Sequence, residues 1–321
     1  MLSQTAGVDA GSTSRVAPLL LLRAVASSSS EQHLEVLTCT RMREIGLVFT
    51  RVGSLALPAQ TPVLEKAREA LALARPWNER IAGEANQYFN FEPETEVEAK
   101  ITVESLQTPW DLASHLAAVV SRGDLRGFIP DVGTEFQRWQ HHQDTFEITG
   151  PANEVGYFAF LPKPEGSFLL KHKTFAHDAL RRREVFKFDV TLPEGTDFEG
   201  YLKETFPRLT VRRLPHLVRT RFDVNVESTQ TGHFYGIEVD EVVVEGYPQT
   251  LRQVEIEYHH SRRHEGLSRD SIEPELLGLE KAVRSELDAL GVTCHSGFYS
   301  KLSFLKDTIA SRPACQETPA V

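Results

Sequence analysis

Short segments in which apolar and polar residues alternate dominate the chain between residues 94 and 259. Alternation with a period of two, bounded by Gly and Pro turns, predicts β-strands with one buried face. Eight strands are expected: 94–103, 145–149, 155–160, 167–173, 183–191, 217–227, 233–245 and 251–259. Another short alternation around residues 45–52 predicts one more strand within 42–58.

Apolar residues recur at helical spacing in a few other segments, and each predicts an amphipathic helix. These segments are 62–83, 109–121, 197–205 and 273–290. In the last segment Leu276, Leu279, Val283 and Leu287 form one stripe, and Gly291 supplies a stop signal. Many short strands with few helices favour a mainly β fold of the α+β class, built as an antiparallel barrel or a sandwich.

Charged residues take one face of these strands, because residues two apart in a strand point the same way. Glu94, Glu96, Glu98 and Lys100 share one face of the first strand, opposite Val97 and its apolar neighbours. Similar pairs recur as Lys171 with Lys173, Arg183 with Lys187, Arg219 with Arg221, Glu238 with Asp240, and Glu255 with Glu257. Periodicity does not decide which face lies inside, so a charged interior and an apolar interior both stay open.

The composition is that of a soluble globular protein, with 321 residues, 40% hydrophobic and 25% charged. A net charge of −10 argues against a nucleic-acid-coating surface, and no apolar run reaches the ~20 residues that span a bilayer. Three cysteines without paired spacing predict reduced thiols and a cytoplasmic location. The charges are segregated, however: residues 161–221 carry 13 Lys and Arg against 8 acids, and residues 222–260 carry 1 Arg against 8 acids.

The run Glu96-x-Glu98-x-Lys100 resembles the ExExK signature of the triphosphate tunnel metalloenzymes, also called the CYTH superfamily. The order of the later segments is also similar: a helix at 109–116, two basic pairs, two acidic pairs and Tyr299-Ser300-Lys301. The resemblance spans residues 91–306, roughly two thirds of the chain. Residues 156–160 depart from the family's usual Tyr-Asp-Thr-Pro segment, which indicates a divergent member.

This resemblance implies an eight-stranded antiparallel β-barrel tunnel with flanking helices that binds a triphosphate with Mg²⁺ or Mn²⁺. The implied metal ligands are Glu96, Glu98, Asp240, Glu255 and Glu257. The implied phosphate ligands are Lys100, Lys171, Lys173, Arg183, Lys187, Arg219, Arg221 and Lys301. Among these residues Glu96, Glu98, Lys100, Glu255 and Glu257 form the expected catalytic set. Carboxylates suit these hard cations, and Lys and Arg neutralise phosphate oxygens.

The function expected from these observations is metal-dependent hydrolysis of the terminal phosphate of a small-molecule triphosphate. Inorganic triphosphate, a nucleoside triphosphate and thiamine triphosphate are all compatible substrates. A class IV-type adenylyl cyclase and a non-catalytic polyphosphate- or nucleotide-binding module stay open as alternatives, and no nucleic-acid or membrane partner is expected. The expected organisation is a flexible tail at 1–40, an extension with a helix at 41–90, the tunnel domain at 91–306 and a second flexible tail at 307–321.

Overall fold

The structure is a computed structural model. It describes residues 20–26, 32–43, 46–57, 62–82, 88–131, 134–152, 155–174, 180–193, 195–263 and 266–311. The remaining parts of the two expected tails, residues 1–19 and 312–321 among them, lie outside the described residues.

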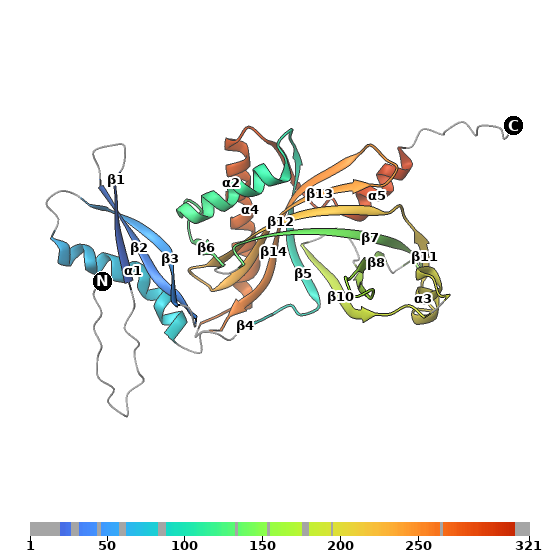
Figure 1. The fold of residues 1–321 in the computed structure, drawn as a ribbon, viewed down its shortest axis with the longest axis horizontal. Coiled ribbons are helices and arrows are strands. Elements are labelled where there is room, and N and C mark those ends of the chain that lie inside the picture. Colours follow the sequence, from blue (N-terminus) through green and yellow to red (C-terminus); the bar gives the residue numbers. More distant parts are fainter. Residues whose placement is uncertain are drawn as a thin grey trace, which may run out of the picture.

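A small antiparallel sheet and one helix form the first described unit (Figure 1). Its elements are β1 (Leu20–Ala26), β2 (Gln32–Arg43), β3 (Gly46–Leu57) and α1 (Val63–Ala82), with strand order β1-β2-β3. Val36 of β2 is buried together with Ala70 and Ala74 of α1, because the apolar stripe of the helix covers one face of the sheet. The flexible tail predicted for 1–40 is therefore wrong for the part that forms β1 and most of β2.

Eight antiparallel strands form a closed barrel, which confirms the predicted fold class. They are β5 (Thr95–Glu104), β7 (Phe136–Gly150), β8 (Gly156–Pro162), β9 (Phe168–Thr174), β10 (Arg181–Val190), β12 (Leu217–Ser228), β13 (His233–Val244) and β14 (Thr250–Arg262). Around the barrel the order is β7-β8-β9-β10-β5-β14-β13-β12, and β12 closes the ring by pairing with β7. Closure gives every one of these strands two neighbours, which leaves the ring without an open edge.

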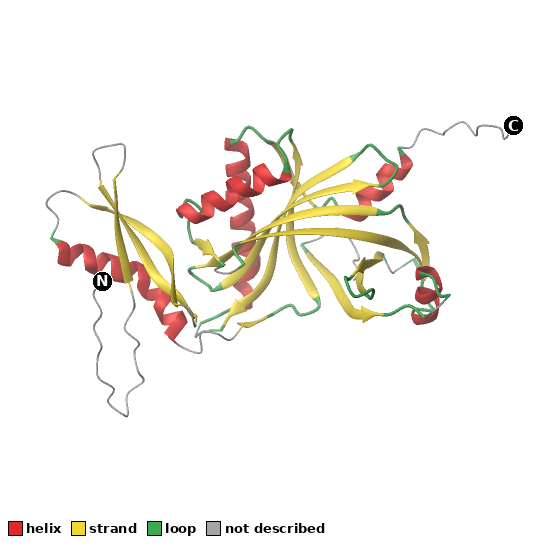
Figure 2. Ribbon diagram, viewed as in Figure 1, coloured by secondary structure: helices red, strands yellow, loops and turns green. Residues whose placement is uncertain are grey.

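Four short strands and four helices accompany the eight strands of the barrel in the described part of the chain (Figures 1 and 2). The short strands are β4 (Tyr88–Phe89), β6 (Phe128–Pro130), β11 (Thr210–Arg213) and β15 (Thr293–Gly297). The helices are α2 (Pro109–Arg122), α3 (Phe198–Thr205), α4 (Ile272–Ala289) and α5 (Lys301–Ala310), with a 3₁₀ turn at Arg269–Ser271 before α4. None of the described helices is both long and apolar enough to cross a membrane.

Helices α2 and α4 lie against the outside of the barrel (Figure 2). Leu112 and Leu116 of α2 and Leu276 of α4 belong to the same buried cluster as Val97 of β5 and Ile256 of β14. The apolar face of these strands is therefore buried beneath helices, outside the barrel. This packing decides the question that periodicity left open, because the opposite, charged face must point into the barrel.

Helix α5 packs on the interior instead. Its Leu302 and Leu305 form a buried cluster with Leu161 of β8, Val242 of β13 and Leu251 of β14. Val242 and Leu251 lie on the inward faces, an even number of positions from the charged interior residues of their own strands, and Leu161 lines the cavity. At this end, apolar contacts with α5 therefore replace the charged lining.

Candidate phosphate and metal site

The barrel encloses a cavity of about 230 Å³ whose wall is mostly charged. Seven cations and five carboxylates line it among the described residues. The cations are Lys100, Lys171, Lys173, Arg182, Arg219, Arg221 and Lys301, and the carboxylates are Glu96, Glu184, Glu238, Glu255 and Glu257. So many charges are stable away from bulk water only where each has a partner or a bound ligand.

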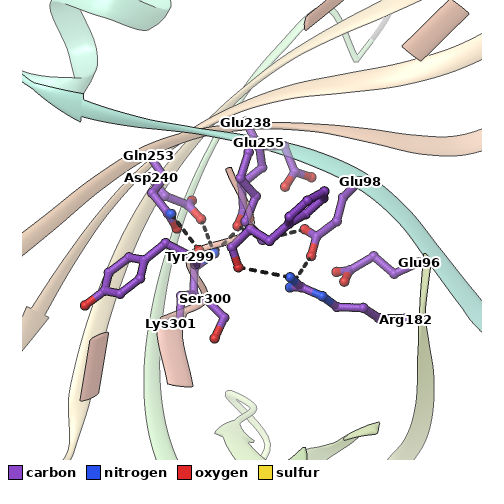
Figure 3. A network of polar contacts seen from close by, with 12 residues as sticks. Glu96, Glu98, Arg182, Glu238, Asp240, Gln253, Glu255, Tyr299, Ser300 and Lys301 are labelled. Atoms are coloured by element: carbon purple, nitrogen blue, oxygen red, sulfur yellow. Dashed lines mark hydrogen bonds and ion pairs between the residues drawn. The ribbon is translucent and has the colours of Figure 1, made fainter. Parts of the chain in front are cut away.

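Glu98 sits at the centre of the first group of ion pairs. It accepts from Lys100 Nζ at 2.7 Å, from Arg182 Nη1 at 2.9 Å and from Lys173 Nζ at 3.3 Å (Figure 3 shows Arg182 beside it). Lys173 also pairs with Glu96. Burial alone would lower the pKa of Lys173, but Glu96 and Glu98 raise it well above its ordinary value. Glu98 thus pairs with three cations, and both of its carboxylate oxygens are used by them.

A second group surrounds Arg221, whose guanidinium contacts three carboxylates closely and a fourth, that of Asp223, at 4.0 Å. It donates to both oxygens of Asp240 at 2.7 Å and to Glu255 Oε2 at 2.6 Å, and it also pairs with Glu238. Lys301, the first residue of α5, reaches Asp240 at 2.8 Å and Glu255 at 2.7 Å (Figure 3). Burial would raise the pKa of Asp240, but Arg221 and Lys301 lower it to about 2. Asp240 and Glu255 therefore hold the cations in place.

Glu257 differs from the other interior carboxylates because no cation pairs with it in the described part of the chain. Carboxylate oxygens of Glu96, Glu184 and Glu257 lie within 4.8 Å of one another. A second group with the same spacing joins Glu257 to Glu238 and His259. Burial, followed by Glu238 and Glu96, raises the pKa of Glu257 well above its ordinary value. Converging carboxylate oxygens are the donors that Mg²⁺ and Mn²⁺ prefer, so these residues fit such an ion. Glu96, Glu184 and Glu238 pair at the same time with Lys173, Lys171 and Arg221.

His141 adds a neutral group to the cavity wall. It lies opposite Arg219 in the pairing of β7 with β12. Burial, followed by the charges of Arg219 and Arg221, lowers its pKa to about 4. At neutral pH its imidazole can therefore both donate and accept a hydrogen bond without adding charge.

Most of the predicted site residues meet in this cavity. Glu96, Lys100, Lys171, Lys173, Arg219, Arg221, Glu255, Glu257 and Lys301 line it, and Glu98 and Asp240 are buried against its lining. Of the five predicted metal ligands, only Glu96 and Glu257 belong to the groups of closely spaced donors. Glu98, Asp240 and Glu255 lie outside these groups and pair with cations, as Glu96 also does with Lys173.

Two predicted phosphate ligands lie on the wrong face of β10. Arg183 has a side chain 66% exposed and pairs with Glu94 at 3.5 Å, while the exposed Lys187 donates to Tyr201 at 2.7 Å. The structure therefore corrects both assignments. The inward face of β10 carries Arg182 and Glu184, one residue out of step with the predicted pair.

Sequence reasoning assigned no role to Arg182, Glu184 or His141. The signal was present in the triplet Arg181-Arg182-Arg183, but every position there is charged, so alternation could not choose the inward one. Glu238 was seen as half of an acidic pair with Asp240 but was not assigned as a ligand. His141 is the inward member of an adjacent histidine pair, and its neighbour His142 is exposed.

Comparisons with known proteins give structural matches only. No family model matches the chain, and no curated protein does. One solved structure is a Hippeastrum protein described as a putative adenylyl cyclase with a dominant triphosphatase activity; it has a TM-score of 0.37 and 14% identity over 67% of this chain and 95% of that chain. Another is the S. pombe RNA triphosphatase Pct1 in complex with the Spt5 CTD, with a TM-score of 0.25 and 10% identity over 73% of this chain and 95% of that chain.

TM-scores this low carry no argument about the fold or the chemistry of this chain, so the fold is judged from the barrel itself. Its eight antiparallel strands close into one ring, and the ExExK alternation of β5 points inward, as the predicted resemblance requires. The apolar interior that had stayed open for these strands is excluded, because their apolar face lies beneath α2 and α4. The chain thus has a closed eight-stranded antiparallel barrel with a charged interior, the fold that the resemblance to the CYTH superfamily predicts.

Proposed function

We propose that the protein hydrolyses the terminal phosphate of a small-molecule triphosphate and that it requires Mg²⁺ or Mn²⁺. The observation that carries this proposal is the enclosed cavity in which seven cations face a cluster of carboxylates centred on Glu257, which has no cation partner among the described residues. A triphosphate brings several negative charges, and the cations would neutralise them. The carboxylate cluster would hold the ion that such enzymes use.

The cations differ in how free they are to meet a phosphate. Arg219 keeps one long ion-pair contact in the described structure, 3.8 Å to Asp240, and its side chain is 13% exposed. Lys171, whose side chain is 17% exposed, pairs with Glu184 at the cavity wall. We assign Arg219 and Lys171 to direct phosphate binding. Arg219 suits bidentate contact with phosphate oxygens, and Lys171 acts as a point charge.

The more deeply buried cations position the carboxylates of the cavity. Lys100, Lys173 and Arg221 each pair with two or more buried carboxylates, so they fix the positions of these side chains before substrate arrives. Preorganised charges need no rearrangement when the reaction begins. Glu96, Glu184 and Glu257 would hold the metal, with Glu238 and His259 beside them. When bound, the ion would polarise the phosphate and lower the pKa of a coordinated water.

The enclosed position of the charges favours a small substrate. The cations point into a cavity of about 230 Å³ and do not form a stripe along the outside of the barrel. A folded nucleic acid needs an accessible cationic surface. We therefore infer a free triphosphate or a triphosphate end that can enter the barrel.

The test is a phosphate-release screen with inorganic triphosphate, ATP and thiamine triphosphate, each with Mg²⁺ or Mn²⁺, with cyclic AMP measured in parallel. We expect release with at least one substrate and a loss of at least about 100-fold for Glu257→Gln, because a metal ligand is removed. Glu94→Gln is the matched control, since its side chain is 65% exposed and lies outside the cavity. Full activity of Glu257→Gln would refute the assigned metal cluster.

The same screen separates the two alternatives. Cyclic AMP with pyrophosphate in place of free phosphate would indicate the cyclase, in which a ribose hydroxyl replaces water. Tight calorimetric binding without any product under either metal would indicate a binding module.

A further inference from the structure

Four residues of the cavity lining that lie on neighbouring strands carry no charge. Leu161 of β8 and Leu169 of β9 lie opposite each other in the strand pairing, and both line the cavity. Tyr157 and Phe186 also line it. We call these four uncharged residues the apolar wall. It is a patch within a charged lining, because β9 and β10 also carry Lys171, Lys173, Arg182 and Glu184 into the cavity.

Phe186 is the exposed member of this wall. Its side chain points into the same cavity as the cations, yet 42% of the residue is accessible to solvent. Its ring lies 6.1 Å from the ring of Phe188 at an angle of 29°, and Phe188 is 66% exposed. A single exposed apolar residue is ordinary on a protein surface. A stacked pair at a charged cavity is different, because one of its rings is part of the wall.

The ring and the phosphate ligands are neighbours. Phe186 pairs across the strands with Lys171, whose Nζ lies 5.5 Å from the centroid of the ring. A phosphate held by Lys171 would therefore place the next chemical group of the substrate beside Phe186. Inorganic triphosphate has no such group and would leave the apolar wall in contact with water.

From this arrangement we infer that Phe186 is a specificity residue that contacts the organic part of the substrate, and that the substrate class is an organic triphosphate bearing an aromatic ring. A flat ring stacks on Phe186 without hydrogen-bonded readout, which tolerates several ring types. The inference rests on the proposed function for the phosphate half of the substrate. It adds which class of triphosphate the cavity prefers.

The test compares KM for ATP, thiamine triphosphate and inorganic triphosphate in the full chain and in Phe186→Ala. We expect KM for the two organic substrates to rise about tenfold, equivalent to about 1.4 kcal/mol, and KM for inorganic triphosphate to change less than about twofold. Phe186→Trp should retain the preference for organic substrates, because it keeps a flat ring. Phe89→Ala is the matched control: Phe89 is 41% exposed, nearly the same as Phe186, but does not line the cavity.

Three results would overturn the inference. An equal rise of KM for all three substrates would mean that Phe186 acts through Lys171 or through folding. Unchanged KM values would mean that the substrate does not touch the ring. Hydrolysis of inorganic triphosphate alone by the unmodified protein would also refute it while leaving the proposed function standing.

Failure of the proposed function leaves the inference testable. If the unmodified protein hydrolyses none of the three compounds, calorimetry with ATP and with inorganic triphosphate in the presence of Mn²⁺ measures the same comparison. A tenfold weaker Kd of Phe186→Ala for ATP alone would support the inference. Equal affinities of the two proteins for ATP, or absence of ATP binding to the unmodified protein, would overturn it.

Discussion

Replacing Arg221 by Ala tests whether the interior charges hold one another in place. The substitution removes the partner shared by Asp240, Glu238 and Glu255, all of which are buried. Breaking a buried ion pair by removing one partner costs about 3–5 kcal/mol, because the other charge is left uncompensated. Lys301 still reaches Asp240 and Glu255, which keeps the cost within this range.

Thermal unfolding followed by circular dichroism at pH 7 measures the effect. For a domain of this size 1 kcal/mol shifts Tm by about 2–4 °C, so Arg221→Ala should lower Tm by roughly 6–20 °C. Arg219→Ala is the matched control on the same face of β12. Among the described residues Arg219 makes one ion pair, 3.8 Å long, so we expect a loss below about 1 kcal/mol. Adding Asp240→Asn to Arg221→Ala should recover part of the stability, because one uncompensated charge disappears. A Tm within about 2 °C of the unmodified protein for Arg221→Ala would refute the reasoning.

Three further predictions concern the metal cluster, the acid limb and the core. Mn²⁺ at 100 times its Kd should stabilise the protein by about 2.7 kcal/mol, and Glu257→Gln should abolish the resulting rise in Tm. Without metal at pH 7 the same variant should have a higher Tm than the unmodified protein, because the raised pKa of Glu257 makes its charged form unfavourable in the folded state. An unchanged Mn²⁺ response of the variant would contradict the metal cluster. Asp240 has a pKa of about 2 in the folded state against an ordinary value of 3.8, so its contribution of about 2 kcal/mol to stability is present above pH 5 and is lost as pH falls toward 2. In urea unfolding, the stability of Asp240→Asn should therefore decrease less between pH 5 and pH 2 than that of the unmodified protein. The same decrease in both proteins would count against this prediction. Leu279→Ala in α4 should lower the free energy of unfolding in urea by about 2–5 kcal/mol, because Leu279 is fully buried. Leu277→Ala, at a position 42% exposed, should lower it far less. Equal losses in the two variants would contradict the packing of α4.

The strands of the barrel were largely predictable from alternation, and so was the charged face of β5. The choice of inside and outside was not available from one strand alone. It follows from a non-local fact: the apolar stripes of α2 and α4 need an apolar surface, and only the outward faces of β5, β12, β13 and β14 provide one. The two stripes were visible in the sequence, so this argument could have been made there.

Other features depend on pairings that alternation does not encode. The first half of β7, residues 136–144, was missed because both of its faces are mostly polar, with Phe136 on one face and Trp139 on the other. The inward face of β10 depends on its register with β9, where Phe186 meets Lys171. Helix α5 was missed as well. It is short, and its apolar residues pack on the end of the barrel, a surface that exists only after the strands have paired. The metal cluster likewise needed three strands in register to bring Glu184 beside Glu96 and Glu257.

The position of Lys301 at the start of α5 links the last helix to the completion of the binding chamber. In chain order β14, β15 and α5 follow the other elements of the barrel, so the ring cannot close before β14 emerges and the cationic lining cannot be complete before α5 docks. A nascent chain that lacks this helix would expose Leu161, Val242 and Leu251 together with the carboxylates Asp240 and Glu255, short of one of their cations. We therefore expect the ability to bind phosphate to arise in one step, when α5 docks on the barrel and Lys301 joins the cationic lining.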